Sequence, residues 1–363
     1  MKRARATGGI GTAWAAVGML ACAGQPTSRP VPSSRAGVEI DLAAEADDRR
    51  ACGGCHEPIL AEWDASQHRG AWSDAVFQSG YAVDRQPECR QCHAPLNREL
   101  RDPEPSSVAA HNGVSCRSCH AVDGRIAGPA SGRVHGGPVA ADWGTSAACQ
   151  GCHEFNFPGE VPGRPVVFDP REAMQRTMSE WAESGSASTC QDCHMPWKVD
   201  EHGVRYRSHR MRGIDDPEFM ASAVQVKLEV RLKGDETVVR ARVFAETLGH
   251  AFPTGDMFRT AELEVWPSGY PQHSQGFEMR REFGTVARTD DEGVVRARGA
   301  EVRDTRPRPG HPVGRTLRFS GVYSELSWQL VHRRMPIAQA RRQGLLEVNA
   351  RVVATGRVPV PTE

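Results

Sequence analysis

One pentapeptide, Cys-x-x-Cys-His, occurs five times in this chain of 363 residues and contains ten of its eleven cysteines. At the chain's own Cys and His frequencies, a single match by chance is expected only about 0.01 times. The five motifs are Cys52/Cys55/His56, Cys89/Cys92/His93, Cys116/Cys119/His120, Cys149/Cys152/His153 and Cys190/Cys193/His194. The fold must therefore accommodate five groups that each take two thiols and one imidazole.

Cys-x-x-Cys-His is the attachment sequence of haem c, in which both thiols bond to the porphyrin and the histidine binds iron as the proximal ligand. The sequence therefore predicts five covalently bound haems. Paired cysteines also build zinc sites, disulfide frameworks and thioredoxin-like redox motifs. Zinc does not require a histidine directly after the second cysteine, and vicinal pairs repeated five times make a poor disulfide scaffold. Haem attachment is the favoured interpretation.

The amino terminus predicts export. A basic start, Met1 to Arg5, precedes a Gly/Ala-rich apolar stretch, Ala6 to Leu20, which is too short and too weakly apolar for a stable membrane span. The eleventh cysteine, Cys22, follows Met19-Leu20-Ala21 as in a bacterial lipobox, so we expect Cys22 to be lipidated. Ordinary cleavage near Ala21 or Ala23 is the alternative. The protein is predicted to be periplasmic, with a lipid anchor in the outer membrane as its membrane contact.

The formal net charge of zero conceals an uneven distribution. Without Lys2, Arg3 and Arg5 the mature chain carries −3, while residues 222–363 carry 22 Lys+Arg against 17 Asp+Glu, a net of +5. The rest of the mature chain is therefore at −8, and haem propionates would add to that negative charge. This balance argues against nucleic acid as a partner. Redox proteins, one electron donor and one acceptor, are the expected partners.

The five motifs fall within residues 52–194, fewer than 30 residues for each. That is too little polypeptide to enclose each haem separately, so the haems are expected to pack against one another.

We predict a signal peptide over residues 1–21, a Pro/Ser-rich linker over 22–48 and a pentahaem domain over 49–218. The last is expected to consist of short helices and loops, with helices from Glu57 to Phe77 and from Asp169 to Glu183. Within them, Trp63 and Trp181 share a Glu-Trp-x-x-Ser pattern, which predicts an indole on a porphyrin face with its N–H free for a propionate, or simple core packing.

After Pro217 the pattern changes to the period of a β-strand. Alternating apolar residues from Val224 to Leu232 precede a turn at Gly234 and a second run from Val238 to Phe244. Further predicted strands are Ala261–Trp266, Arg315–Tyr323 and Leu345–Val353. Residues 219–363 are therefore expected to form an antiparallel β-sandwich-like domain, which makes the whole an α+β two-domain protein. No catalytic motif occurs in this part, and no catalytic residue is assigned.

The sixth iron ligands distinguish an electron carrier from an enzyme. Iron with histidine on both sides can only pass electrons, whereas an open position can bind and transform a small molecule. A continuous helix would carry His68 about 18 Å beyond His56, so His68 should serve a neighbouring haem. His250 lies in a tight turn of the β-domain and could reach a haem at the domain interface. The candidate distal ligands are His68, His111, His135, His209 and His250.

Several of these segments resemble the cytochrome c-554-type multihaem cytochromes. The resemblance lies in Cys52-Gly-Gly-Cys-His56 with Trp63 and His68, in Gly113-Val-Ser-Cys116, in Cys193-His-Met-Pro196 with Ser208-His-Arg210, and in Gly249-His250 with Pro253-Thr-Gly255. It implies a periplasmic electron carrier with mostly bis-histidine haems and His68, His111 and His209 as distal ligands. The chain departs from the four-haem prototype by its fifth motif and its long β-domain, so the order of haems does not transfer.

Two functions follow as hypotheses. The favoured one is a relay of single electrons through a stack of five haems. The alternative is a multihaem oxidoreductase that acts on a small nitrogen or sulfur compound at one five-coordinate haem.

Overall fold

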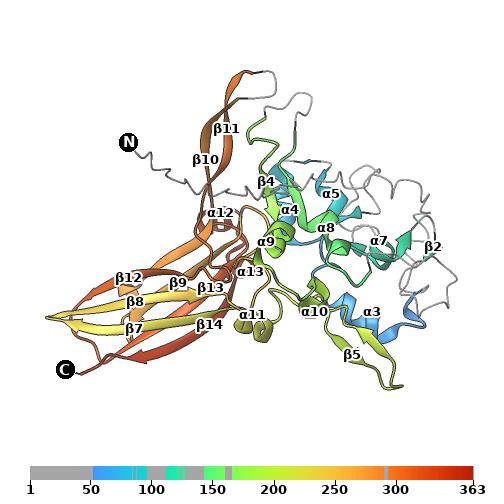
Figure 1. The fold of residues 1–363 in the computed structure, drawn as a ribbon. Coiled ribbons are helices and arrows are strands. Elements are labelled where there is room, and N and C mark those ends of the chain that lie inside the picture. Colours follow the sequence, from blue (N-terminus) through green and yellow to red (C-terminus); the bar gives the residue numbers. More distant parts are fainter. Residues whose placement is uncertain are drawn as a thin grey trace, which may run out of the picture. The chain divides into compact units, whose positions relative to one another are not determined.

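The computed structural model describes residues 52–83, 85–86, 88–95, 112–122, 125–126, 143–159, 166–289 and 293–362. Its first half consists of short helices and loops, and its second half is an antiparallel β-structure (Figure 1). This confirms the predicted fold class. Within the ranges just given, no helix is long and apolar enough to cross a membrane.

The described helices of the first half are five to nine residues long. The predicted helix from Glu57 to Phe77 is wrong, because α3 (Glu57–Asp64) stops before a run of turns and α4 (Ala75–Val83) begins a new helix. The second predicted helix starts late, since β4 (Ala173–Arg176) precedes α9 (Thr177–Ser184). The other elements of this half are α5 (Glu88–His93), α7 (Cys116–His120), β1 (Ala121–Val122), β2 (Arg125–Ile126), α8 (Ala147–His153), β3 (Glu154–Asn156), α10 (Cys190–His194), β5 (Trp197–Val199), β6 (Arg205–Arg207) and α11 (Pro217–Ala223).

The carboxyl-terminal half contains a three-stranded and a five-stranded sheet, with strand orders β12-β8-β7 and β11-β10-β9-β13-β14. All their strand pairs are antiparallel. Apolar side chains from both sheets, including Val239, Leu263, Phe319 and Leu330, form one buried core. The strands are β7 (Gln225–Lys233), β8 (Glu236–Phe244), β9 (Thr260–Pro267), β10 (Gln275–Thr289), β11 (Val295–Asp304), β12 (Val313–Ser320), β13 (Glu325–Arg333) and β14 (Ala350–Pro359), with η4 (Pro271–His273), α12 (Ile337–Arg342) and α13 (Leu346–Asn349) between strands.

Two strands that the pattern did not predict, β10 and β11, form a long arm (Figure 1). Beyond Arg280 the strand β10 no longer pairs with β9 and continues with β11 alone. The arm binds the haem-motif half, because Asp169 N–H donates to the Gly299 carbonyl and Gly299 N–H donates to the Val167 carbonyl, at 2.9 and 2.8 Å. The arm was not predicted because its sequence is polar and lacks a regular alternation of apolar residues.

Candidate haem-binding site

Four of the five motifs form single helical turns, α5, α7, α8 and α10, and the first motif directly precedes α3. Residues three positions apart lie on the same side of a helix, so one turn directs both thiols of a motif the same way. Thr189 caps α10 by accepting a hydrogen bond from Asp192 N–H at 3.3 Å, while the Asp192 carboxylate accepts one from Thr189 N–H at 2.9 Å. The local sequence thus holds the Cys-x-x-Cys-His turn in shape.

The ten motif cysteines differ in their exposure. Cys55, Cys119 and Cys193 are exposed, whereas the other seven are partly buried. Each of the three exposed residues is the second cysteine of its motif. A porphyrin bonded to such a thiol would cover it, and the thioether bonds at all ten cysteines stay a prediction.

Three candidate distal histidines face the histidine of a motif. The ring centroids of His68 and His153 are 6.3 Å apart, those of His120 and His209 are 6.1 Å apart, and those of His194 and His250 are 6.2 Å apart. Each pair joins residues that are distant in sequence. The rings of the last pair are also nearly parallel, with an interplanar angle of 22°.

These separations fit an iron between each pair. A metal–imidazole bond is about 2.0 Å long and the nitrogen lies about 1.1 Å from its ring centre, so two rings on opposite sides of one metal have centroids about 6.2 Å apart. Among the residues whose placement is given, no group of three or more His, Cys, Asp or Glu side chains could hold a metal ion. A facing pair suffices for haem, because the porphyrin supplies the other four ligands.

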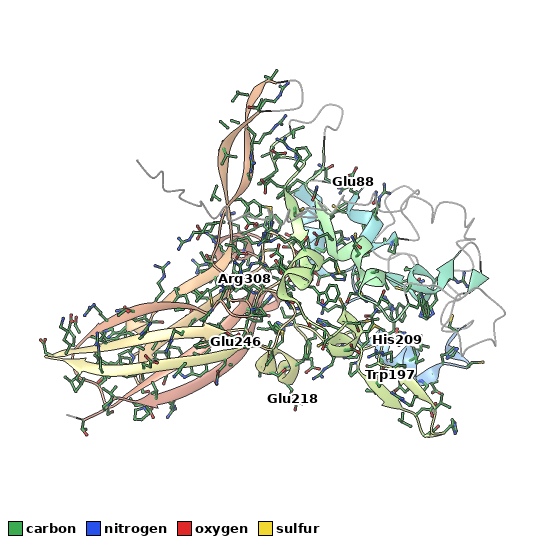
Figure 2. All side chains as sticks on the ribbon, in the orientation of Figure 1. Glu88, Trp197, His209, Glu218, Glu246 and Arg308 are labelled. Carbon is green, nitrogen blue, oxygen red and sulfur yellow. The ribbon has the colours of Figure 1, made fainter. Side chains whose placement is uncertain are left out.

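Backbone carbonyls orient several of these rings through Nδ1. His93, His194, His209 and His250 place Nδ1 at 2.7, 2.6, 2.8 and 2.9 Å from the carbonyl oxygens of Ala71, Arg212, Arg207 and Ala251. Such a contact requires Nδ1 to carry the proton, which leaves the lone pair on Nε2 for a metal. His209 is positioned directly after β6, the strand paired with the one that carries Trp197 (Figure 2).

Burial keeps these imidazoles neutral. Desolvation, followed by repulsion from neighbouring histidines, lowers the pKa of His68 and of His153 to about 4. Desolvation also lowers the pKa of His93, His194 and His250. A neutral imidazole keeps the nitrogen lone pair that an iron ligand needs.

Neighbouring motifs touch through their cysteines. The thiols of Cys92 and Cys152 are in hydrogen-bonding contact, which together with burial raises the pKa of the Cys92 thiol. The thiols of Cys149 and Cys190 make the same kind of contact. The fourth motif therefore adjoins both the second and the fifth, although about 40 to 60 residues separate the contacting cysteines in sequence.

The remaining predicted site residues are distributed as follows. His93 stacks on Phe77 with centroids 3.6 Å apart, and its motif cysteine Cys89 packs on a cluster of Trp72, Tyr81 and Ala94. His56 precedes α3. The candidate ligands His111 and His135 and the lipidation candidate Cys22 lie outside the described residues, so their predictions stay open.

The two Glu-Trp-x-x-Ser tryptophans do not have free indole N–H groups. Trp63 donates to the Val114 carbonyl at 2.8 Å, and Trp181 donates to the Ser188 carbonyl at 2.9 Å. Trp72 is 1% exposed, and among the buried side-chain atoms of the described residues its indole N–H is one that has no hydrogen-bond partner. A buried N–H without an acceptor is costly, and a haem carboxylate would satisfy it. The unpartnered N–H of Trp72 becomes visible only in the folded structure.

Gly113 holds the segment that carries His68. Its φ is +48°, and a Cβ there would lie 2.4 Å from the His68 carbonyl oxygen and 2.7 Å from that of Arg69. Val114 N–H also donates to the His68 carbonyl at 2.9 Å. We expect Gly113→Ala to displace His68 from His153 and to produce high-spin iron, measured by electron paramagnetic resonance. Gly144→Ala is the control, since Gly144 also has positive φ but has no atom within 4 Å of its Cβ position; equal spectra for the two variants would contradict this prediction.

Comparisons with known proteins point to cytochromes that carry several haems. Residues 51–121 match the family model described as cytochrome c554 and c-prime. The fold is similar to a crystal structure of a penta-heme cytochrome c552 from Thermochromatium tepidum, with a TM-score of 0.63 and 19% identity over 86% of this chain and 98% of that chain. No curated protein matches the chain.

Proposed function

We propose that this multihaem c-type cytochrome carries five haems and relays single electrons between two redox proteins of the periplasm. Haem c supplies a one-electron iron couple whose potential depends on its axial ligands and its surroundings. The five motifs would attach the haems through the ten cysteines listed above. The proposal includes a lipid anchor at Cys22 and an outer-membrane location, for which the support is the lipobox-like sequence alone.

The observation that carries the proposal is the set of three facing histidine pairs. Their separations of 6.1 to 6.3 Å suit iron with an imidazole on each side. Such iron has no position left for a substrate, so transfer of electrons is the chemistry that remains to it. In these pairs His153, His120 and His194 would be proximal ligands, and His68, His209 and His250 would be distal ligands.

The contacts between motifs support passage of electrons from haem to haem. The second, fourth and fifth motifs adjoin through Cys92–Cys152 and Cys149–Cys190. Thioether bonds at these cysteines would bring three porphyrin edges close together. This chain's contribution is to hold the haems at fixed separations and to keep their axial imidazoles neutral and correctly oriented.

The haem content and spin state of the purified protein test the proposal. We expect the alkaline pyridine spectrum to give five haems for each chain, and electron paramagnetic resonance of the oxidised protein to show low-spin iron only. Fewer than five haems would contradict the count. A high-spin ferric signal in the unmodified protein would instead favour the alternative, a haem oxidoreductase acting on a small nitrogen or sulfur compound.

A further inference from the structure

The turn that carries His250 is held by a buried ion pair between the two halves of the chain. His250 lies between β8 and β9, in a segment of bends and turns with no regular structure of its own. Arg306, which follows β11, has a side chain that is only 2% exposed. The side chain of Glu180, in α9, is 5% exposed. Neither residue belongs to a Cys-x-x-Cys-His motif, and the sequence singled out neither.

Arg306 binds the turn and the helix at once. Its Nη1 donates to the Pro253 carbonyl at 2.9 Å, and its Nη2 donates to Glu180 Oε1 at 2.5 Å. Its Nε donates to Asp304 Oδ1 at 2.9 Å, so carboxylates on two elements surround the guanidinium. A planar guanidinium can make these three bonds in different directions at the same time, which an ammonium group cannot do with the same geometry.

Glu180 completes the connection from the other side. Its Oε2 accepts a hydrogen bond from the Thr254 hydroxyl at 2.8 Å, and the Thr254 and Thr177 hydroxyls lie 2.9 Å apart. The Phe252 N–H donates to the Pro307 carbonyl at 2.9 Å. The backbone on the carboxyl side of His250 is thus tied at Phe252, Pro253 and Thr254. Little freedom remains for the imidazole, which lies 6.2 Å from that of His194.

The turn also packs closely on α9. A Cβ at Gly249 would lie 3.0 Å from Cδ1 of Trp181, so a larger residue would press against the indole and glycine favours this close approach. Glu180 and Trp181 are neighbours in sequence and contact opposite ends of the same turn: Glu180 binds Thr254, and Trp181 packs beside Gly249. Removing Glu180 would leave Arg306 with Asp304 as its carboxylate partner, and removing Arg306 would leave Glu180 with Arg176, whose Nε lies 3.6 Å from Oε1. Either loss would remove the buried ion pair that links α9 to the turn.

We propose that Arg306 and Glu180 position His250 as the axial ligand that the β-domain supplies to the fifth haem, so that ligation depends on contact between the two halves. This inference rests on the proposed ligation of the fifth haem by His194 and His250. Arg306 is a positioning residue that acts through His250.

The test compares Arg306→Met with His250→Ala in the full-length holoprotein. We expect both variants to show the same new high-spin ferric signal, equivalent to one iron, and we expect added imidazole to remove it in both. The double variant should show no second high-spin iron. Arg318→Met is the control, since Arg318 pairs with Glu236 at the surface and should leave the spectrum unchanged.

The outcomes separate the two claims. If His250→Ala stays fully low-spin, the proposed ligation is wrong. If His250→Ala becomes high-spin and Arg306→Met does not, the ligation stands and the positioning role of Arg306 is wrong. Should Arg306→Met not accumulate, Glu180→Gln keeps the shape and removes the charge. In Glu180→Gln the His250 imidazole should leave the iron more often, so the sixth position of that iron is open in a larger fraction of molecules. We therefore expect this variant to bind imidazole about tenfold more tightly than the unmodified protein. Equal affinities would overturn the inference.

Discussion

Replacing His68 by alanine should convert one haem iron from low-spin to high-spin without loss of the covalently attached haem. His68 faces His153 at 6.3 Å and is neutral, since burial lowers its pKa to about 4. Alanine leaves the sixth position of that iron open to water or a small ligand. Electron paramagnetic resonance of the oxidised protein should then show a high-spin signal equivalent to one iron. We expect His68→Met to keep the iron low-spin and to raise its midpoint potential, on the order of 100 mV.

The matched control is His202→Ala. The His202 side chain is 79% exposed and faces no motif histidine among the residues described by the structure. Its loss should change neither the spin state nor the potentials. If His68→Ala remains fully low-spin while its haem content is unchanged, the pairing of His68 with His153 is wrong. A high-spin signal in both variants would show instead that loss of any histidine disturbs the haems.

Replacing Arg281 by methionine should strongly destabilise the folded protein. The Arg281 side chain is 3% exposed, and its Nε donates to Glu301 at 2.7 Å. Its Nη1 donates to the Met174 carbonyl at 2.9 Å, which links the base of the β10–β11 arm to β4. Methionine fills much of the volume but leaves the partly buried Glu301 carboxylate and the Met174 carbonyl without this donor. We expect the free energy of unfolding to fall by about 3 kcal/mol, measured by urea denaturation of the holoprotein.

Arg318→Met serves as the control for stability as well. Arg318 and Glu236 are 50% and 41% exposed and lie 3.2 Å apart. Solvent screens such a pair, so its loss should cost less than about 1 kcal/mol. Equal losses for Arg281→Met and Arg318→Met would show that the arm contributes no more than an ordinary surface contact. A loss confined to Arg281→Met would support a structural role for the arm at β4.

The strands show which elements an alternation of apolar residues can predict. The alternation from Val224 to Leu232 and the turn at Gly234 correspond to β7, β8 and the turn between them, where Gly234 has φ +61°. The prediction missed β10 and β11, because their exposed faces are rich in charged residues and their apolar contacts are few. It also missed β13, a central strand of the larger sheet with inward residues such as Leu326 and Leu330.

The helices were harder to delimit. Glu57 to Asp64 is rich in helix-forming residues, yet the chain turns after Asp64, in a stretch that includes Gly70, and carries His68 in a non-helical segment. The expectation that His68 serves a neighbouring haem relied on a helix that does not exist. His68 nevertheless lies opposite the histidine of another motif, for a tertiary reason: Gly113 and Val114 hold the His68 backbone from a distant part of the chain.

The sequence by itself pointed to haem c chemistry. Five Cys-x-x-Cys-His motifs predict haem attachment locally, because each places two thiols and an imidazole within a few consecutive residues. Which histidine faces which motif was decided only by the tertiary structure. The partners are separated by tens of residues, and their meeting depends on a glycine, on carbonyl acceptors and on a buried ion pair. No local pattern encodes those contacts, because each forms only when distant segments pack together.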